Sequence, residues 1–184
     1  AALDPRISPW DEPGVGGMGE HNLYLTHLAI VLAARDRLAP EACDAALHDR
    51  LAQHLAARSL AHPDGLARSF PSATERWPAD QAATLFALHR YDKVHGSSLS
   101  AEPVARYLRW MDRVRTPEGL LPNEVTGKAT AADTPRGSAM TWTVRYLAPI
   151  PPDAARALWD ATRRALVVAV GPMTGVREWP VGHD

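Results

Sequence analysis

The sequence predicts an all-α protein built from repeated helical hairpins, and three observations indicate this fold class. Helix-forming segments that are apolar almost all round alternate with segments that are apolar on one face only. The turn Pro-Asp-Gly-Leu at 63–66 returns as Pro-Glu-Gly-Leu at 117–120. Arg76 and Arg136 lie sixty residues apart, each just before an apolar segment. A repeat of this period is typical of stacked copies of one supersecondary unit.

The first hairpin is expected to follow an irregular segment at the start of the chain. Residues 1–19 are rich in proline and glycine and predict an irregular lead-in. Residues 20–34 are helix-forming and apolar almost all round, which predicts a helix buried on most sides. Pro40 is expected to open a second helix that runs to about Ser59, with its leucines on one face. This pairing predicts a buried inner helix and an amphipathic outer helix.

The same pairing returns twice. Residues 80–88 predict another apolar helix, and Ser100 is the expected cap of an amphipathic fourth helix. Residues 137–147 predict a short apolar fifth helix, and 152–164, which begin with a proline, predict a sixth. The segment 165–170 fits either the last turns of that helix or a buried strand.

The turns between the helices carry the clearest part of the repeat. Gly65 and Gly119 are expected to supply a positive φ, each followed by a short extended β-arm. A weaker third copy lies at 174–176. Residues 20–184 are therefore expected to form three helical hairpins of one domain.

Composition and motifs exclude several function classes. Lysine plus arginine number 20 and aspartate plus glutamate 21, so the net charge of −1 argues against a general nucleic-acid binder. Cys43 is the only cysteine, which excludes an internal disulfide and a cysteine-rich zinc site. No apolar run approaches the roughly 20 residues of a membrane span. Phosphate-loop, dinucleotide and HExxH patterns are absent, and His48 and His54 are expected to be solvated, so no cofactor or metal is predicted.

Stacked hairpins with a buried first helix and an amphipathic second helix resemble the (α/α) toroids of the six-hairpin glycosidase-like superfamily. The resemblance covers most of the chain and is one of organisation, without a catalytic motif of one family. It implies an inner ring of first helices and an outer ring of second helices. Those folds commonly use about six hairpins, so the resemblance implies a partial or half toroid completed by further chain or an associated subunit. A small compact bundle closed by the lead-in is the alternative.

The toroid arrangement would bring the long arms and the starts of the inner helices to one rim. The candidate acid/base carboxylates at this rim are Glu20, Asp80, Glu124 and Glu178. The candidate substrate-binding residues are His21, Asn22, Tyr24, Arg76, Trp77, Asn123, Arg136 and Trp142. Tryptophan faces pack on the C–H surfaces of sugars and carboxylates accept from hydroxyls, so a glycan or another small ring-shaped molecule is the expected substrate. A competing explanation for Glu20 and Asp80 is stabilisation of a first helical turn.

These residues predict a carbohydrate-active enzyme. Glycoside hydrolysis needs a pair of carboxylates, one to protonate the leaving oxygen and one to activate water or attack the sugar. Uronate lyases and epimerases instead use a protein group that accepts a proton from the carbon beside the substrate carboxylate. An arginine pairs with that substrate carboxylate. Two alternatives stay open at this point: a toroid that only binds glycan or protein, and an isomerase or cyclase with an apolar pocket.

Overall fold

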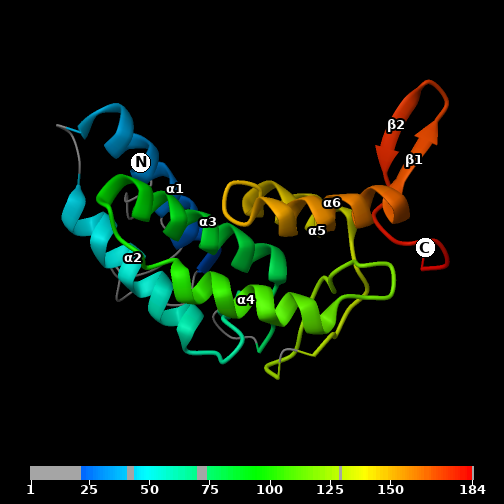
Figure 1. Cartoon of the computed structure of the whole chain (residues 1–184), viewed down its shortest axis with the longest axis horizontal. Coiled ribbons are helices and arrows are strands. Elements are labelled where there is room, and N and C mark those ends of the chain that lie inside the picture. Colours follow the sequence, from blue (N-terminus) through cyan, green and yellow to red (C-terminus); the bar gives the residue numbers. More distant parts are fainter. Residues whose placement is uncertain (1–21, 41–43, 70–73, 129, 184) are drawn as a thin grey trace, which may run out of the picture.

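The computed structural model describes residues 22–40, 44–69, 74–128 and 130–183. In this part of the chain it has six α-helices and one two-stranded sheet, which confirms the all-α prediction (Figure 1). The elements are α1 (Asn22–Leu38), α2 (Ala45–Leu60), α3 (Pro78–His95), α4 (Ala101–Val114), α5 (Gly137–Leu147), α6 (Pro152–Leu166), β1 (Val167–Val170) and β2 (Met173–Val176). The predicted lead-in at 1–19, together with Glu20 and His21, lies outside the described residues.

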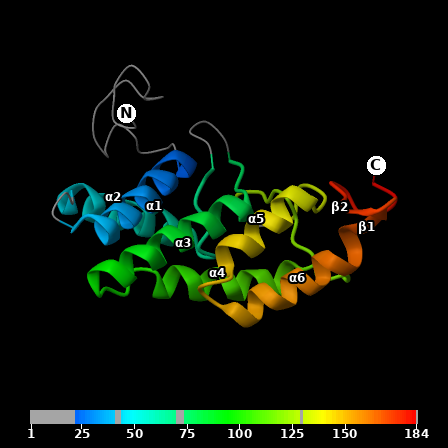
Figure 2. The same cartoon turned by 90° about the horizontal axis from the view of Figure 1, so that it is seen from above.

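The first, third and fifth helices lie side by side. Helix α3 packs between α1 and α5, while α2 packs on α1 and α3, and α6 packs on α5. Figure 2 shows α4 and α6 together on one side of α3 and α5. Helices α1, α3 and α5 thus form a central row on which α2 and α6 pack.

Helix α3 joins the two parts of the core. Pro78 occupies its first turn, and Gly96 ends it with a left-handed φ of 67°. Leu85 packs in the cluster that α4, α5, α6 and the arms form, whereas Leu88 and Tyr91 pack in the cluster of α1 and α2. Because it contributes to both clusters, α3 is buried along most of its length.

A buried polar contact fixes α1 against α3. The Asn22 amide donates to the Thr84 hydroxyl at 3.0 Å, and the Thr26 and Thr84 hydroxyls lie 2.9 Å apart. Thr84 in turn donates to the main-chain carbonyl of Asp80 at 3.0 Å. Buried hydroxyls and amides are stable only when paired in this way, so the set specifies how the two helices align.

Local hydrogen bonds correct one predicted helix start and one predicted helix cap. Helix α2 begins at Ala45 and not at Pro40, because the Asp44 carboxylate accepts the main-chain N–H of Leu47 at 3.1 Å and caps the helix there. Ser100 does precede α4, but its hydroxyl makes no cap bond and donates to the Asp92 carboxylate at 2.6 Å.

The region after the sixth helix also differs from the prediction. The helix continues to Leu166, and the ambiguous segment then forms β1, which pairs antiparallel with β2. Both strands are largely exposed, so neither is a buried strand. Gly65 and Gly119 have the expected positive φ of 70° and 88°. In the third copy of the turn, the positive φ was expected near Gly175. It is found instead at Gly171, with a φ of 58°, between β1 and β2.

The two long arms pair with one another. The main-chain groups of Arg76 and Val125 exchange hydrogen bonds of 3.2 and 3.0 Å, and Val125 also bridges to Ala131. Val125 is fully buried. The pairing brings the start of α3 and the segment before α5 to the same end of the molecule. Within the described residues, none of the helices combines the length and apolarity of a membrane span.

Helices α1, α3 and α5 keep some apolar surface. Leu28 and Leu85 are buried, whereas Leu23, Phe86 and Val144 are only half-buried. These half-buried side chains belong to α1, α3 and α5, which lie side by side. The toroid and its completion by further chain or a subunit stay predictions.

Candidate active site

A pocket of about 240 Å³ opens between the starts of α3 and α5. Its walls are mainly apolar, with three polar side chains among them. The lining residues are Leu23, Trp77, Ala79, Asp80, Asn123, Ser138, Ala139 and Trp142. Four of the residues that the sequence predicted as site residues therefore share one pocket, namely Asp80, Trp77, Asn123 and Trp142.

Asp80 is the ionisable group of this pocket. It lies in the first turn of α3 and is 6% exposed. Burial raises the pKa of its carboxyl to about 6, although a hydrogen bond from Ser69 and the nearby His27 ring act in the opposite direction. A carboxylate stabilises a first helical turn only in its ionised form, and burial disfavours that form here. At pH 7 a carboxyl with a pKa of about 6 is still mostly ionised, so Asp80 can stabilise this turn and also face the pocket as a base.

Ser69 holds the Asp80 carboxyl in place. The Ser69 hydroxyl accepts the main-chain N–H of Trp77 at 2.8 Å and donates to Asp80. Ser69 itself is 4% exposed. A hydroxyl that is oriented by a main-chain donor at the start of the helix leaves Asp80 little freedom to rotate away from the pocket.

An aromatic group from α1, α3 and α5 adjoins the pocket at Trp142. The His27 ring lies 5.9 Å from Trp142 and 6.4 Å from Tyr146, and Tyr146 lies 5.4 Å from Phe86. His27 Nδ1 lies 2.8 Å from the Leu23 carbonyl, which can only accept, so Nδ1 carries a proton. The other ring nitrogen, Nε2, lies 3.3 Å from the Tyr146 hydroxyl and shares a hydrogen bond with it.

His27, Tyr146 and Phe86 were not among the residues that the sequence predicted for the site. His27 is half-buried, hydrogen-bonded to the Leu23 carbonyl, and part of the aromatic group. A signal for Tyr146 was present, because it follows Trp142 by four residues on a predicted helix and so shares its face.

Glu124 and Glu178 do not line the pocket. Glu124 is half-buried and directly follows Asn123, which lines the pocket from a bend of the arm. The Glu178 carboxylate accepts from Ser138 twice, from the main-chain N–H at 3.0 Å and the hydroxyl at 2.7 Å. Glu178 thus caps the start of α5.

Arg76 lines a neighbouring cavity of about 370 Å³. The other lining residues of this cavity are Arg58, Ala61, His62 and Arg68. Burial and the positive charges of Arg68 and Arg58 lower the pKa of the Arg76 guanidinium, which donates to the Leu66 carbonyl at 2.9 Å. Three guanidinium groups around one cavity create a local positive potential that suits an anionic ligand.

The remaining predicted residues have structural contacts. Arg136 donates to Asp133 at 3.0 Å and lies 5.9 Å over the Trp179 ring, so it joins the second arm to the third. Asn22 is buried between α1 and α3. Tyr24 is half-buried, and burial raises the pKa of its hydroxyl. Substrate-binding roles for these residues stay predictions.

Among the described residues, one set of histidine and carboxylate side chains is close enough to hold a metal ion: Asp36, His48 and His95. The set lies away from the pocket, because His95 is the last residue of α3 whereas Asp80 lies in the first turn of that helix. A separation of 15 residues along a helix corresponds to about 22 Å.

No protein-family model matches the chain, and a search of curated proteins finds no significant match.

Proposed function

We propose that the chain is a carbohydrate-active enzyme that transfers protons on an acidic sugar, as uronate lyases and epimerases do, with Asp80 as the proton acceptor. The observation that carries the proposal is a buried carboxyl, with its pKa raised to about 6, in a pocket walled by Trp77 and Trp142. An ordinary carboxylate is a weak base, and a pKa nearer neutrality makes proton transfer more effective. With a pKa of about 6, the group is about nine-tenths ionised at pH 7.

The substrate class follows from the two cavities. Trp77 and Trp142 offer flat faces for a sugar ring, and Asn123 and Ser138 offer hydrogen bonds to its hydroxyls. Arg76 and Trp77 are successive residues that line different cavities, so the arginine cavity lies next to the pocket. Arginine pairs with a carboxylate through two parallel hydrogen bonds, which favours a uronate over a neutral sugar.

The reaction requires one proton acceptor and one donor. Asp80 removes the proton on the carbon beside the substrate carboxylate, and that C–H electron pair forms a C=C bond as the bond to the leaving oxygen breaks. The hydrogen-bonded pair of His27 and Tyr146 supplies the proton that the leaving oxygen takes. In an epimerase the proton would instead return to the same carbon from the opposite face.

The packing supports a toroid for this enzyme. Helices α1, α3 and α5 would be its inner helices, because they lie side by side and the site opens at their starts and along their half-buried faces. Helices α2, α4 and α6 would be outer helices.

Glycoside hydrolysis fits the pocket less well. It needs a second carboxylate, and Asp80 is the only one among the described residues that line the pocket. An isomerase or cyclase on an apolar substrate is the second candidate, because Leu23, Ala79 and Ala139 make much of the wall apolar. Asp80 would carry the proton in both reactions, so the substrate decides between them.

The test is turnover of uronate-containing oligosaccharides, followed by the ultraviolet absorbance of the new C=C bond and by exchange of the C–H proton with deuterated water. We expect activity in the parent chain and none in Asp80→Asn. Asp112→Asn, at a carboxylate whose side chain is 76% exposed, is the matched control and should keep full activity. Reducing-end release without either signal would point to hydrolysis and overturn the proposal, as would equal activity in Asp80→Asn.

A further inference from the structure

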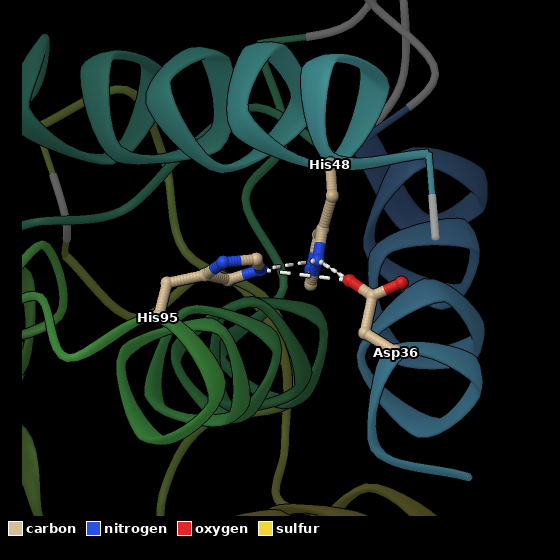
Figure 3. A group of neighbouring side chains, drawn as sticks. All are labelled: Asp36, His48 and His95. Carbon is tan, nitrogen blue, oxygen red and sulfur yellow. Dashed lines mark hydrogen bonds and ion pairs between the residues drawn. The ribbon is translucent and has the colours of Figure 1, made fainter. Parts of the chain in front are cut away.

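The ends of three helices bring together one carboxylate and two imidazoles. Asp36 lies in the last turn of α1, His48 in the first turn of α2, and His95 is the last residue of α3. Figure 3 shows His48 reaching from α2 into the space between His95 and Asp36. Asp36 and His48 are buried, and the His95 side chain is 22% exposed. The cluster is separate from the Asp80 pocket and has no part in the proposed reaction.

The three nearest atoms form a triangle of the size that a metal ion requires. His48 Nδ1 lies 2.7 Å from Asp36 Oδ2 and 3.1 Å from His95 Nε2, and His95 Nε2 lies 3.5 Å from Asp36 Oδ2. Zinc bonds to nitrogen and oxygen ligands at about 2.0–2.1 Å, so neighbouring ligands of a tetrahedral ion lie about 3.3 Å apart. All three sides of the triangle come within several tenths of an ångström of that value.

Hydrogen bonding alone satisfies this cluster poorly. His48 Nδ1 can carry at most one proton. If His48 Nδ1 carries that proton and donates to Asp36, it cannot accept from His95 across 3.1 Å, and His95 Nε2 can then donate only to Asp36 over 3.5 Å. If Nδ1 carries no proton, its lone pair faces that of an ionised Asp36 across 2.7 Å. A cation at the centre accepts a lone pair from each of the three atoms at once. The arrangement is therefore better explained by a bound cation than by shared protons.

We propose that Asp36, His48 and His95 bind a divalent transition-metal ion, for which zinc is the best match, and that the ion fastens α1, α2 and α3 to one another. Two imidazoles and one carboxylate are a ligand set typical of zinc and of neighbouring transition metals, whereas magnesium and calcium prefer all-oxygen ligands. Three protein ligands leave the remaining position of a tetrahedral ion to solvent.

A cleft beside Asp36 is the route by which we expect solvent to reach the remaining position. A cleft of about 530 Å³ adjoins Asp36. Its other lining residues are Arg37, His89, Arg90, Lys93 and Val94. Arg37 and Lys93 are exposed, so water and salt screen their repulsion of a cation. One carboxylate leaves bound zinc with a net charge of +1, and the positive cleft favours a hydroxide or another anion as the fourth ligand.

Sequence reasoning expected His48 to be solvated on the outer helix, and this was wrong because its side chain is fully buried. A signal was available in the leucine pattern. His48 lies three residues before Leu51, one residue after Leu47, and therefore on the face that packs inward.

The test uses the purified chain after treatment with a chelator. Added zinc should raise the melting temperature by about 5–10 °C at a hundredfold excess over its Kd, and cobalt should give a visible absorption band. Magnesium should do neither. Because His95 is partly exposed at a helix end, His95→Ala should fold and lose both responses.

Two further variants separate a metal site from a hydrogen-bonded cluster. Asp36→Asn keeps an oxygen that can accept from His48 but is a poorer metal ligand, so zinc affinity should fall at least about a hundredfold. His54→Ala, also on α2 but outside the cluster, should respond to zinc like the parent chain. Absence of a zinc-dependent melting shift in the parent chain, or equal shifts in the parent chain and His95→Ala, would overturn the proposal.

Discussion

The Ser69 hydroxyl donates a hydrogen bond to the buried carboxyl of Asp80. This contact joins the first arm to the first turn of α3. It stabilises the ionised carboxylate against the effect of burial, so it sets how far the pKa of Asp80 rises. Because Ser69 is itself fixed by the main chain of Trp77, the pKa depends on the packing of the arm on the helix.

Ser69→Ala should therefore raise the pKa of Asp80 above about 6. The variant removes the hydrogen bond that favours the charged form and leaves the burial that opposes it. Titration of the carboxyl carbon by NMR measures the pKa directly. Ser98→Ala, at an exposed position between α3 and α4, is the control and should leave the pKa unchanged. An unchanged or lower pKa in Ser69→Ala would show that this hydrogen bond does not stabilise the ionised carboxylate.

Asp80→Asn should stabilise the chain at pH 7. Burial raises the folded-state pKa of Asp80 from 3.8 to about 6, so the folded state binds this proton more tightly than the unfolded state. Stability is therefore lost as pH rises from about 4 to 6, and the full loss, up to about 3 kcal/mol, is present above pH 6. An uncharged amide avoids this loss.

Urea denaturation of both forms at pH 4 and pH 7 checks this prediction. The free energy of unfolding of Asp80→Asn should exceed that of the parent chain at pH 7, and the two should converge towards pH 4. A variant that loses activity while gaining stability is typical of a residue kept for function. An Asn variant less stable than the parent at pH 7 would indicate that the carboxylate has a structural role.

The parts of the fold that the sequence predicted best are those set by local patterns. Residues 137–147 were predicted with the observed bounds of α5, because a glycine and an apolar run mark that helix unambiguously. The start of α2 was misplaced because a proline in a favourable position competed with Asp44, and only Asp44 makes the cap bond. The third turn was assigned to Gly175, whereas the strand pairing selects Gly171.

The candidate site was partly predictable for a similar reason. Asp80 and Trp77 belong to one helix start, so the sequence placed them together, and the arm brought Asn123 to them. Glu124 was grouped with them because it directly follows Asn123, but of these two residues only Asn123 lines the pocket. The cluster of Asp36, His48 and His95 depends on how three helices end relative to one another. Tertiary packing decides that, and no spacing within the sequence encodes it.

Glu178→Ala should destabilise the chain by about 1 kcal/mol. The carboxylate accepts both the main-chain N–H and the hydroxyl of Ser138, so its removal leaves the first turn of α5 without its cap. Glu178→Gln keeps one acceptor and should cost less. Thermal unfolding of the two variants measures the difference. A Glu178→Gln variant that is as stable as the parent chain but inactive would instead return Glu178 to a catalytic role.

Gly137→Ala should be more damaging than any surface substitution near the site. The segment after β2 crosses the start of α5 so closely that a Cβ at position 137 would lie 2.0 Å from the main-chain oxygen of Arg177. The Gly137 N–H also donates to the Glu178 carbonyl at 2.8 Å, so the two segments cannot separate without losing that bond. Forced overpacking of this kind costs about 1–3 kcal/mol.

Gly127→Ala is the matched control for this last variant. A Cβ at Gly127 meets no atom within 4 Å, and its φ is outside the left-handed region, so the substitution should change stability by less than about 0.5 kcal/mol. Because the crossing segment includes Glu178, Gly137→Ala should also expose the start of α5 to solvent, measured as faster hydrogen exchange at Ser138. Equal unfolding free energies for the two alanine variants would show that the segment after β2 does not pack on α5 in solution.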